Sequence, residues 1–290
     1  MIKTIAQLIR LKQWIKNLFV LFPIFFSKQL FNTQAWIVCI IATFCFCLVA
    51  SAVYCINDIV DRKKDQLHPK KKFRPLASGR VNLKTAIVYA IMLLFCGLSI
   101  NLFMVGVTTT YILSSYFLLN IAYSFWLKNI AIIDAFIIAI GFVLRIYIGC
   151  IAISVWISPW MVCMTFLLTL FLAFSKRRND FIIEIESGIK IRESVSEYSL
   201  LFLNILIGML SGVTLVCYIM FTLSDVIMER VGSQYLYFTS IFVFAGMIRY
   251  LLLVFNNQER EGPTEILWHD KFLISCIVLW ILSYGFLMYL

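Results

Sequence analysis

Nine long runs of apolar residues constrain the fold of this 290-residue chain more than any other feature. Most of them approach the ~20 residues that a helix needs to cross the ~30 Å hydrocarbon core of a bilayer. The shorter alternating strands of a membrane barrel are absent from the sequence. The runs fall at 14–27, 36–56, 86–104, 108–126, 131–153, 158–174, 202–223, 234–255 and 271–290. We therefore predict an all-α, polytopic membrane protein with nine transmembrane helices.

The first run is the least regular, because Lys16 and Asn17 begin it and Pro23 interrupts it. We expect this segment to enter the membrane at a slant or to be kinked. Nine cysteines lie within or at the ends of apolar runs, without the paired spacing of a metal site. We interpret them as small hydrophobic residues in helix packing.

The basic residues predict the orientation of the chain. All but four of the 25 Lys and Arg residues fall in the N-terminal segment and in every second loop, whereas the opposite side has only Lys28 and Arg230. Positive loops stay in the cytoplasm, so we predict a multi-pass protein of the cell (inner) membrane with its N-terminus inside and its C-terminus outside. Topology and anionic lipids account for the net charge of +10, and no nucleic acid is expected as a partner.

The most informative stretch follows the second run and contains Asp58, Asp61 and Asp65. If the helix continues, steps of three and four residues place the three carboxylates along one face. Like charges at a helix C-terminus repel one another and oppose the helix dipole, so a cation should offset them. Mg²⁺ takes a few protein carboxylates and completes its octahedron with substrate oxygens.

We therefore predict that these three aspartates bind Mg²⁺ and, through it, a diphosphate. Asp58 and Asp61 are the candidate catalytic residues, and Asn57 beside them is a candidate substrate ligand. The alternative is that the aspartates only pair with the neighbouring Arg62, Lys63 and Lys64 in a solvated loop.

A turn-rich, basic loop at 68–80 comes next. Lys and Arg bind phosphate through charge-assisted hydrogen bonds. A patch that only contacts anionic lipid headgroups would carry a similar charge. The candidate phosphate ligands of this loop are Lys72, Arg74, Ser78 and Arg80.

Two of these segments carry a family resemblance. "NDIVDRKKD" at 57–65, followed by "RPLASGR" at 74–80, resembles the UbiA superfamily of intramembrane prenyltransferases, whose first aspartate-rich motif reads Asn-Asp-x-x-Asp-x-x-x-Asp. Nine spans with the motif after the second fit that family over essentially the whole chain. The resemblance implies a membrane-bound transferase in which 1–290 form a single UbiA-like transmembrane domain, a helical bundle with a cytoplasmic-side active site.

Within the superfamily, "LIRLKQWIKNLFVLFPIFF", "YSFWLKNIAIIDAF" and "GFVLRIYIGCIAI" look most like decaprenyl-phosphate phosphoribosyltransferases. Those enzymes transfer 5-phosphoribose from phosphoribosyl diphosphate to a polyprenyl phosphate. The resemblance implies the same substrates here, release of diphosphate and a role in cell-envelope biosynthesis. It also makes Lys16 and Asn17 candidate substrate ligands. The sequence leaves the oligomeric state open, a homo-oligomer included.

One departure from ordinary prenyltransferases favours this branch. Those enzymes carry a second aspartate-rich motif in the loop after the sixth span, whereas this chain has Lys176, Arg177 and Arg178 there. An acidic cluster helps to bind a metal on a prenyl diphosphate, but a basic cluster binds phosphate directly. These residues are therefore candidate substrate ligands in an enzyme with phosphates on both substrates. The alternative is a charge that only sets topology.

Polar residues near the start of the fifth span complete the candidates. Asp134 lies a few residues into the span, where an ionisable group is costly unless it faces a watery cavity. We predict that it is a third catalytic residue, which accepts ribose hydroxyls or assists the metal. Tyr123 and Lys128 precede it as candidate substrate ligands. Arg145, further along the span, is expected to bond to another helix, with a lipid phosphate as the minority interpretation.

Two other functions are compatible with parts of the pattern. A prenyltransferase that alkylates an aromatic or other small acceptor shares the first acidic motif, but the basic replacement of the second motif disfavours it. A transporter or flippase would suit the many spans, but the sequence has no evident internal repeat and its acids gather at one surface.

Overall fold

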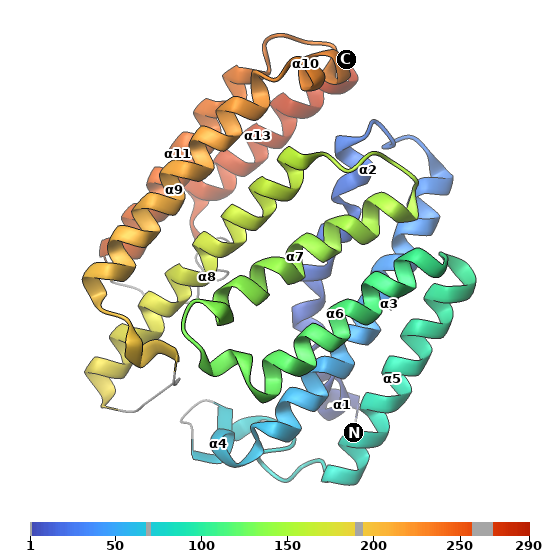
Figure 1. Cartoon of the computed structure of the whole chain (residues 1–290), viewed down its shortest axis with the longest axis vertical. Helices are drawn as coiled ribbons and strands as arrows, with labels where there is room; N and C mark the ends of the chain where they lie inside the picture. The colour runs from blue at the N-terminus through green and yellow to red at the C-terminus, as the bar shows by residue number, and fades with distance from the viewer. Residues whose placement is uncertain (1, 68–70, 189–193, 257–268) are drawn as a thin grey trace. The chain divides into compact units, whose positions relative to one another are not determined.

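The computed structural model of the chain describes residues 2–67, 71–188, 194–256 and 269–290, and every regular element in them is a helix (Figure 1). The packing divides the chain into two compact units, Met1–Ile157 and Ser158–Leu290. The prediction of a single domain stays a prediction. The first unit contains α1 (Ile2–Leu8), η1 (Leu11–Leu21), α2 (Phe22–Phe26), α3 (Thr33–Val60), α4 (Arg62–Leu67), η2 (Lys71–Phe73), α5 (Leu83–Met104), α6 (Val107–Phe125), η3 (Leu127–Asn129) and α7 (Ile133–Ala152). The second contains α8 (Pro159–Ser187), η4 (Ser194–Glu197), α9 (Leu200–Thr222), α10 (Asp225–Val231), η5 (Leu236–Thr239), α11 (Ser240–Asn256) and α13 (Lys271–Tyr289).

Seven stretches among the described residues are long and apolar enough to cross a membrane. They contain α3, α5, α7, α8, α9, α11 with η5, and α13, and they correspond to seven of the nine apolar runs. The run at 108–126 also folds as a helix, α6, but this helix contains several Thr, Ser and Asn residues and is not among the seven. The count of nine spans stays a prediction.

The first apolar run does not form a long α-helix. Residues Leu11–Leu21 form the 3₁₀ helix η1, which is far longer than the three or four residues usual for this geometry. The short helix α2 follows, with Pro23 in its first turn, where proline is tolerated because its missing N–H would have no helical partner. The expected irregularity of this segment is therefore a change of helix type.

Polar residues define where the membrane helices begin. The Asn32 side chain accepts hydrogen bonds from the backbone N–H groups of Gln34 and Ala35 at the start of α3. Asn82 caps α5 in the same way, and Ser199 caps α9. Such caps satisfy backbone donors that the first helical turn leaves without partners.

Helix α3 forms the centre of the first unit, where it packs against α5, α6, α7 and η1 (Figure 1). Two-thirds of its most apolar stretch is buried, and its core side chains include many Ala and Cys residues. Small side chains allow close helix contact, as the expected packing role of the cysteines requires. None of the nine cysteines, all of them described residues, forms a disulfide, and seven of them are buried.

The second unit packs α8 against α9 and α11 against α13. The Tyr218 hydroxyl joins α9 to η5 and α13. Its Oη lies 2.6 Å from Thr239 Oγ1 and accepts a hydrogen bond of 2.6 Å from Trp280 Nε1. Many large apolar side chains of both units are exposed. Such surfaces are expected where the surrounding medium is lipid.

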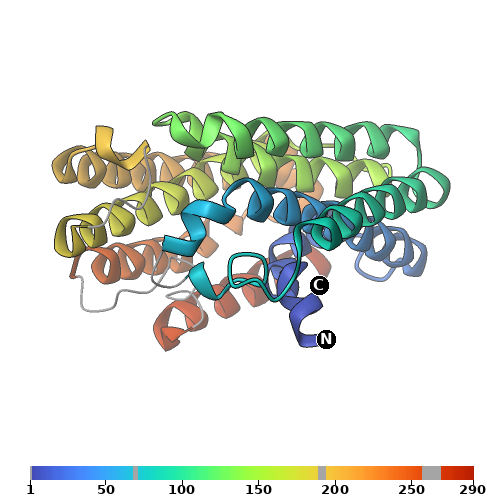
Figure 2. The same cartoon turned by 90° about the horizontal axis from the view of Figure 1, so that it is seen from below.

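The end of α3 carries the acidic motif. Figure 1 shows α4 and the N-terminus at the same end of the first unit, and Figure 2 views that end from below, with α4 in cyan. The turn from α3 into α4 thus brings the aspartates, the basic loop and the first residues of the chain into one region.

Candidate active site

The three aspartates lie where α3 ends. The helix stops at Val60, and Asp61 follows it with φ −87° and ψ 2°. Its backbone N–H still donates to the Asn57 carbonyl at 2.9 Å, and the Asp65 N–H donates to the Asp61 carbonyl at 2.8 Å. The chain therefore continues with nearly helical hydrogen bonds across a break at Asp61, which replaces the uninterrupted helix that we considered.

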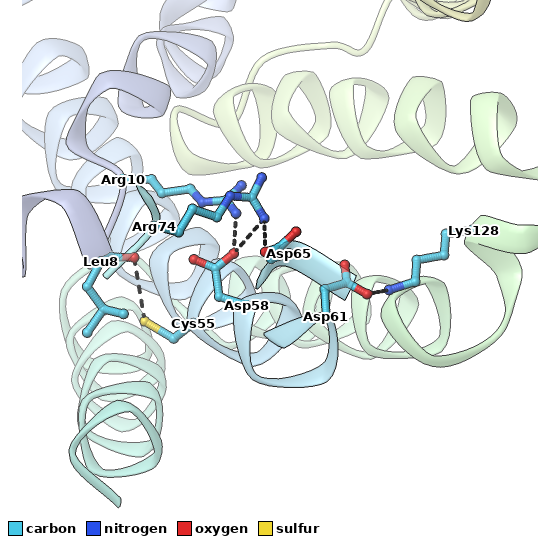
Figure 3. A network of polar contacts seen from close by, with 8 residues as sticks. All are labelled: Leu8, Arg10, Cys55, Asp58, Asp61, Asp65, Arg74 and Lys128. Atoms are coloured by element: carbon cyan, nitrogen blue, oxygen red, sulfur yellow. Dashed lines mark hydrogen bonds and ion pairs between the residues drawn. The ribbon is translucent and has the colours of Figure 1, made fainter. Parts of the chain in front are cut away.

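Two arginines engage Asp58 and Asp65 (Figure 3). Arg74 Nη1 lies 3.1 Å from Asp58 Oδ1 and 2.6 Å from Asp65 Oδ2, so one guanidinium bridges both carboxylates. Arg10 also donates to Asp58 Oδ1. Arg74 comes from the basic loop that the sequence singled out, and its contact with the acidic motif joins those two features in space.

Asp61 has a different cation. Its Oδ1 lies 2.5 Å from Nζ of Lys128, in the short segment between α6 and α7 (Figure 3). In the part of the chain that the structure describes, no three His, Cys, Asp or Glu side chains gather closely enough to hold a metal ion. The structure thus divides the three aspartates between two sets of ion pairs.

The burial of Asp58 bears on whether a metal fits here. The residue is only 2% exposed, and among the described residues its Oδ2 atom accepts no hydrogen bond. A buried carboxylate oxygen without a donor is costly and suits a cation as partner. Because Mg²⁺ usually takes one or two carboxylates and fills its other positions with water and substrate oxygens, the residues present fit such an ion.

Arg10 is a site residue that the sequence analysis did not select. It has φ 52° and ψ 52°, a left-handed conformation that is uncommon outside glycine, and it directly precedes η1. Its guanidinium carbon lies 4.8 Å from the centre of the Tyr54 ring. The sequence signal was weak, because an arginine before the first apolar run also suits the topology rule.

Helix η1 runs along one face of α3 and holds Arg10 in place. Trp14 Nε1 donates to Ser51 Oγ at 3.0 Å, and Asn17 Nδ2 donates to Cys47 Sγ at 3.1 Å. Together with the pairing of Arg10 and Asp58, these bonds form a ladder along the two elements. The partners on α3 recur at steps of four and seven residues, which is the spacing of one helical face.

The ladder places Asn17 in the core of the first unit. Asn17 is buried and accepts a hydrogen bond of 3.0 Å from Arg145 Nε. Arg145 also donates to the Gly141 carbonyl at 2.7 Å, and its guanidinium carbon lies 4.5 Å from the Phe46 ring centre and 4.9 Å from that of Phe142. The contacts of Arg145 therefore join α7 to η1, as the structural interpretation of this arginine predicted.

Other residues of the basic loop shape the loop itself. Ser78 Oγ donates to the Arg74 carbonyl at 2.8 Å and accepts from Arg80 Nε at 3.0 Å. Arg80 Nη1 also donates to Gln7 Oε1 at 3.0 Å. Lys72 is exposed and lies over the Phe73 ring. Residues 68–70 of this loop lie outside the described residues.

The remaining candidates of the first unit lie close to Lys128 in sequence or within η1. Asp134 is fully buried in the first turn of α7, where the positive end of the helix dipole favours a carboxylate. Tyr123 lies, half-buried, in the last turn of α6, and Lys16 lies in η1. Their roles as ligands stay predictions.

The two arginines of the basic cluster form hydrogen bonds and an ion pair within the second unit. Arg178 is buried, and it donates to Asn204 Oδ1 and to the Val254 carbonyl, both at 2.7 Å, so it ties α8 to α9 and α11. Arg177 is also buried and pairs with Asp180 at 3.4 Å. Lys176 is exposed. Phosphate binding by these three residues stays a prediction.

Comparison with known proteins relates the chain to one family. The UbiA prenyltransferase family matches residues 18–277. The decaprenyl-phosphate phosphoribosyltransferase of Corynebacterium glutamicum is 29% identical over 94% of this chain and 83% of its own. The enzyme of the same name from Mycolicibacterium smegmatis is 27% identical over 100% of this chain and 93% of its own.

The fold comparison agrees with the sequence comparison. A UbiA homologue from Archaeoglobus fulgidus, solved with GPP and Mg²⁺, superimposes with a TM-score of 0.71 at 18% identity, covering 99% of this chain and 100% of that one. With its apolar helices and its acidic motif at the end of α3, the chain belongs to the UbiA prenyltransferase family and is a membrane-bound transferase.

Proposed function

We propose that this protein transfers 5-phosphoribose from phosphoribosyl diphosphate to a polyprenyl phosphate in a Mg²⁺-dependent reaction that releases diphosphate. The observation that carries the proposal is the alternation of carboxylates and basic groups at the end of α3. Asp58 and Asp65 share Arg74, and Asp61 pairs with Lys128. Such a site can bind a metal through its acids and phosphate oxygens through its bases.

The named relatives support the choice of donor and acceptor. Two decaprenyl-phosphate phosphoribosyltransferases align with nearly the whole of this chain. The basic cluster at Lys176, Arg177 and Arg178 also suits two phosphate-bearing substrates, although the contacts of Arg178 within its own unit leave Lys176 as the more accessible ligand.

In this reaction the bond from the ribose anomeric carbon to the diphosphate breaks, and a bond from that carbon to a lipid phosphate oxygen forms. Asp58, Asp61 and Asp65 would hold Mg²⁺, which offsets charge on the departing diphosphate. Arg10, Arg74 and Lys128 lie beside these acids and can bind phosphate oxygens. The acceptor phosphate is an anion at neutral pH, so no strong general base is needed. In-line attack predicts inversion at the anomeric carbon.

The membrane supplies the acceptor from the side. We propose that the acidic motif faces the cytoplasm, with the N-terminus inside and the C-terminus outside, because the basic loops gather on that side. The lipid phosphate then lies at the interface, and the isoprenoid tail lies along apolar helix surfaces within the bilayer.

A second candidate is transfer of an isoprenoid from a prenyl diphosphate to an aromatic or other small acceptor. The match to the prenyltransferase family favours it, and so does the fold of a relative that was solved with GPP and Mg²⁺. Both candidates need the first acidic motif, so the donor must be identified by assay.

The test uses purified protein with radiolabelled phosphoribosyl diphosphate, polyprenyl phosphates of several lengths and Mg²⁺. We expect label in the organic phase, and its loss with chelator. Asp58→Asn should reduce transfer by about two orders of magnitude or more, because it removes a buried carboxylate from the charged site. Asp225→Asn alters an exposed aspartate of α10 and should leave the rate unchanged.

Consumption of a prenyl diphosphate with an aromatic acceptor, without any phosphoribosyl transfer, would replace the proposal by the second candidate. Equal transfer by the Asp58→Asn variant and the natural protein would remove the acidic motif from the mechanism.

A further inference from the structure

The acids at the end of α3 are matched one for one by bases. Arg10, Arg74 and Lys128 contribute three positive charges to the three negative charges of the aspartates (Figure 3). Two of these bases come from segments distant in sequence from the motif, 48 positions away for Arg10 and 67 positions away for Lys128. The packing of the first unit has therefore assembled a cluster whose charges cancel.

The two arginines are more accessible than the carboxylates they engage. The side chains of Arg10 and Arg74 are 21% and 26% exposed, whereas those of Asp58 and Asp65 are 2% and 5% exposed. A charged ligand that reaches the site from solvent therefore meets the guanidinium groups before it meets these acids.

Charge balance restricts what this cluster can bind. A divalent cation that binds these carboxylates comes next to the guanidinium groups of Arg10 and Arg74, which repel it, and it adds two positive charges to six residues whose charges cancel. A diphosphate alone would face the buried Asp58. If the ion and the diphosphate bind together, the ion can take the carboxylates while the bases take the phosphate oxygens, and opposite charges stay adjacent throughout.

We propose that Arg10, Arg74 and Lys128 are exchangeable counter-ions of the acidic motif. A divalent cation displaces them from Asp58, Asp65 and Asp61, and they then bind the diphosphate of the donor. The exchange makes metal binding and diphosphate binding cooperative. The proposal rests on the proposed function only in assuming a diphosphate donor.

The surroundings of Arg10 suit such an exchange. Its guanidinium lies over the Tyr54 ring as well as against Asp58, so a favourable contact remains when the carboxylate pairs with a metal. Its backbone is held in the left-handed region, which is strained for a residue with a side chain. The ladder between η1 and α3 keeps that conformation in place, and the side chain stays next to the site. The unpartnered Oδ2 of Asp58 independently points to a cationic ligand.

The alternative is that these bases only stabilise the fold. The two interpretations predict opposite signs for one measurement. If Arg10 competes with the metal, its removal tightens the binding of metal alone. If Arg10 only supports the fold, its removal leaves the site unchanged or disorganised, and metal binding stays equal or weakens.

The experiment titrates detergent-solubilised protein first with Mn²⁺ alone, followed by electron paramagnetic resonance, and then with inorganic diphosphate in excess Mg²⁺, followed by calorimetry. For Arg10→Gln we expect Mn²⁺ to bind about tenfold more tightly and diphosphate about tenfold more weakly, each equivalent to ~1.4 kcal/mol. Arg74→Gln, on a separate segment, should show the same pair of opposite changes and serves if the first variant does not fold.

Lys63→Gln is the matched control. Lys63 is an exposed base within the 57–65 segment, and it forms no ion pair with the described residues. It measures the general effect of one lost charge, and we expect both affinities to change less than twofold. If the folded arginine variants bind Mn²⁺ with unchanged or lower affinity, the exchange is refuted. Both titrations are independent of which group the diphosphate carries, so they can succeed or fail separately from the phosphoribosyl transfer assay.

Discussion

Gly149 gives the sharpest test of the packing that positions the site. It lies in α7, and a Cβ atom built on it would be 2.1 Å from the Val20 carbonyl oxygen and 2.9 Å from Cγ of Pro23. Because ordinary contacts begin near 3.4 Å, the backbone of η1 would have to retreat by about 1.3 Å in Gly149→Ala. The obstacle is main chain, so no rotamer change can relieve it.

The expected magnitude combines two opposing effects. Overpacking a close contact costs about 1–3 kcal/mol, while replacing glycine by alanine inside a helix returns about 1 kcal/mol. Gly141 provides a control on the same helix, since a Cβ there would meet only Tyr116 and Arg145 at 3.5 and 3.6 Å. Gly141→Ala should therefore be neutral or stabilising, and the two variants should differ by roughly 1–3 kcal/mol.

The assay is thermal unfolding of both variants in one detergent, followed by tryptophan fluorescence. We expect Gly149→Ala to melt below the natural protein and Gly141→Ala to melt at or above it. Gly149→Ala should also bind diphosphate in excess Mg²⁺ more weakly, because Arg10 directly precedes η1 and would move with it. Equal melting of the two variants would show that η1 does not contact α7 at Gly149 and would refute the reasoning.

Two predictions concern the second unit. Arg178→Met should lower stability by about 1–3 kcal/mol in the same melting assay, because the half-buried Asn204 on α9 and the buried Val254 carbonyl on α11 lose their donor, while Lys176→Gln at an exposed position should have no effect. A destabilisation no larger than that of the control would contradict this role. The hydrogen bond from Arg249 lowers the pKa of Asp270 below its ordinary 3.8, so its stabilisation is complete above that pH and is lost as the pH falls through the folded pKa. Asp270→Asn should thus melt below the natural protein at pH 7 and approach it in acid, and a gap that does not depend on pH would exclude the ion pair as its cause.

The long helices were predictable because their signal is local. An apolar run of about 20 residues specifies a membrane helix by its own composition, and the bounds of α3, α5 and α9 lie within a few residues of the predicted runs. The acidic motif was equally readable, since three aspartates at steps of three and four residues are visible without any tertiary contact. By contrast, the 3₁₀ geometry of η1 was not visible, because its stability depends on contacts with α3 and α7.

Composition and spacing are properties of neighbouring residues, so the amino-acid sequence was enough to predict a bundle of membrane helices with an acidic motif after the second apolar run. The packing of distant segments was needed to see that Arg10 joins the site, that Asn17 belongs to the core, and that Arg74 bridges Asp58 and Asp65. A basic residue near a membrane surface has the same local pattern whether it sets topology, supports packing or faces a carboxylate. Its role depends on which distant segment packs against it.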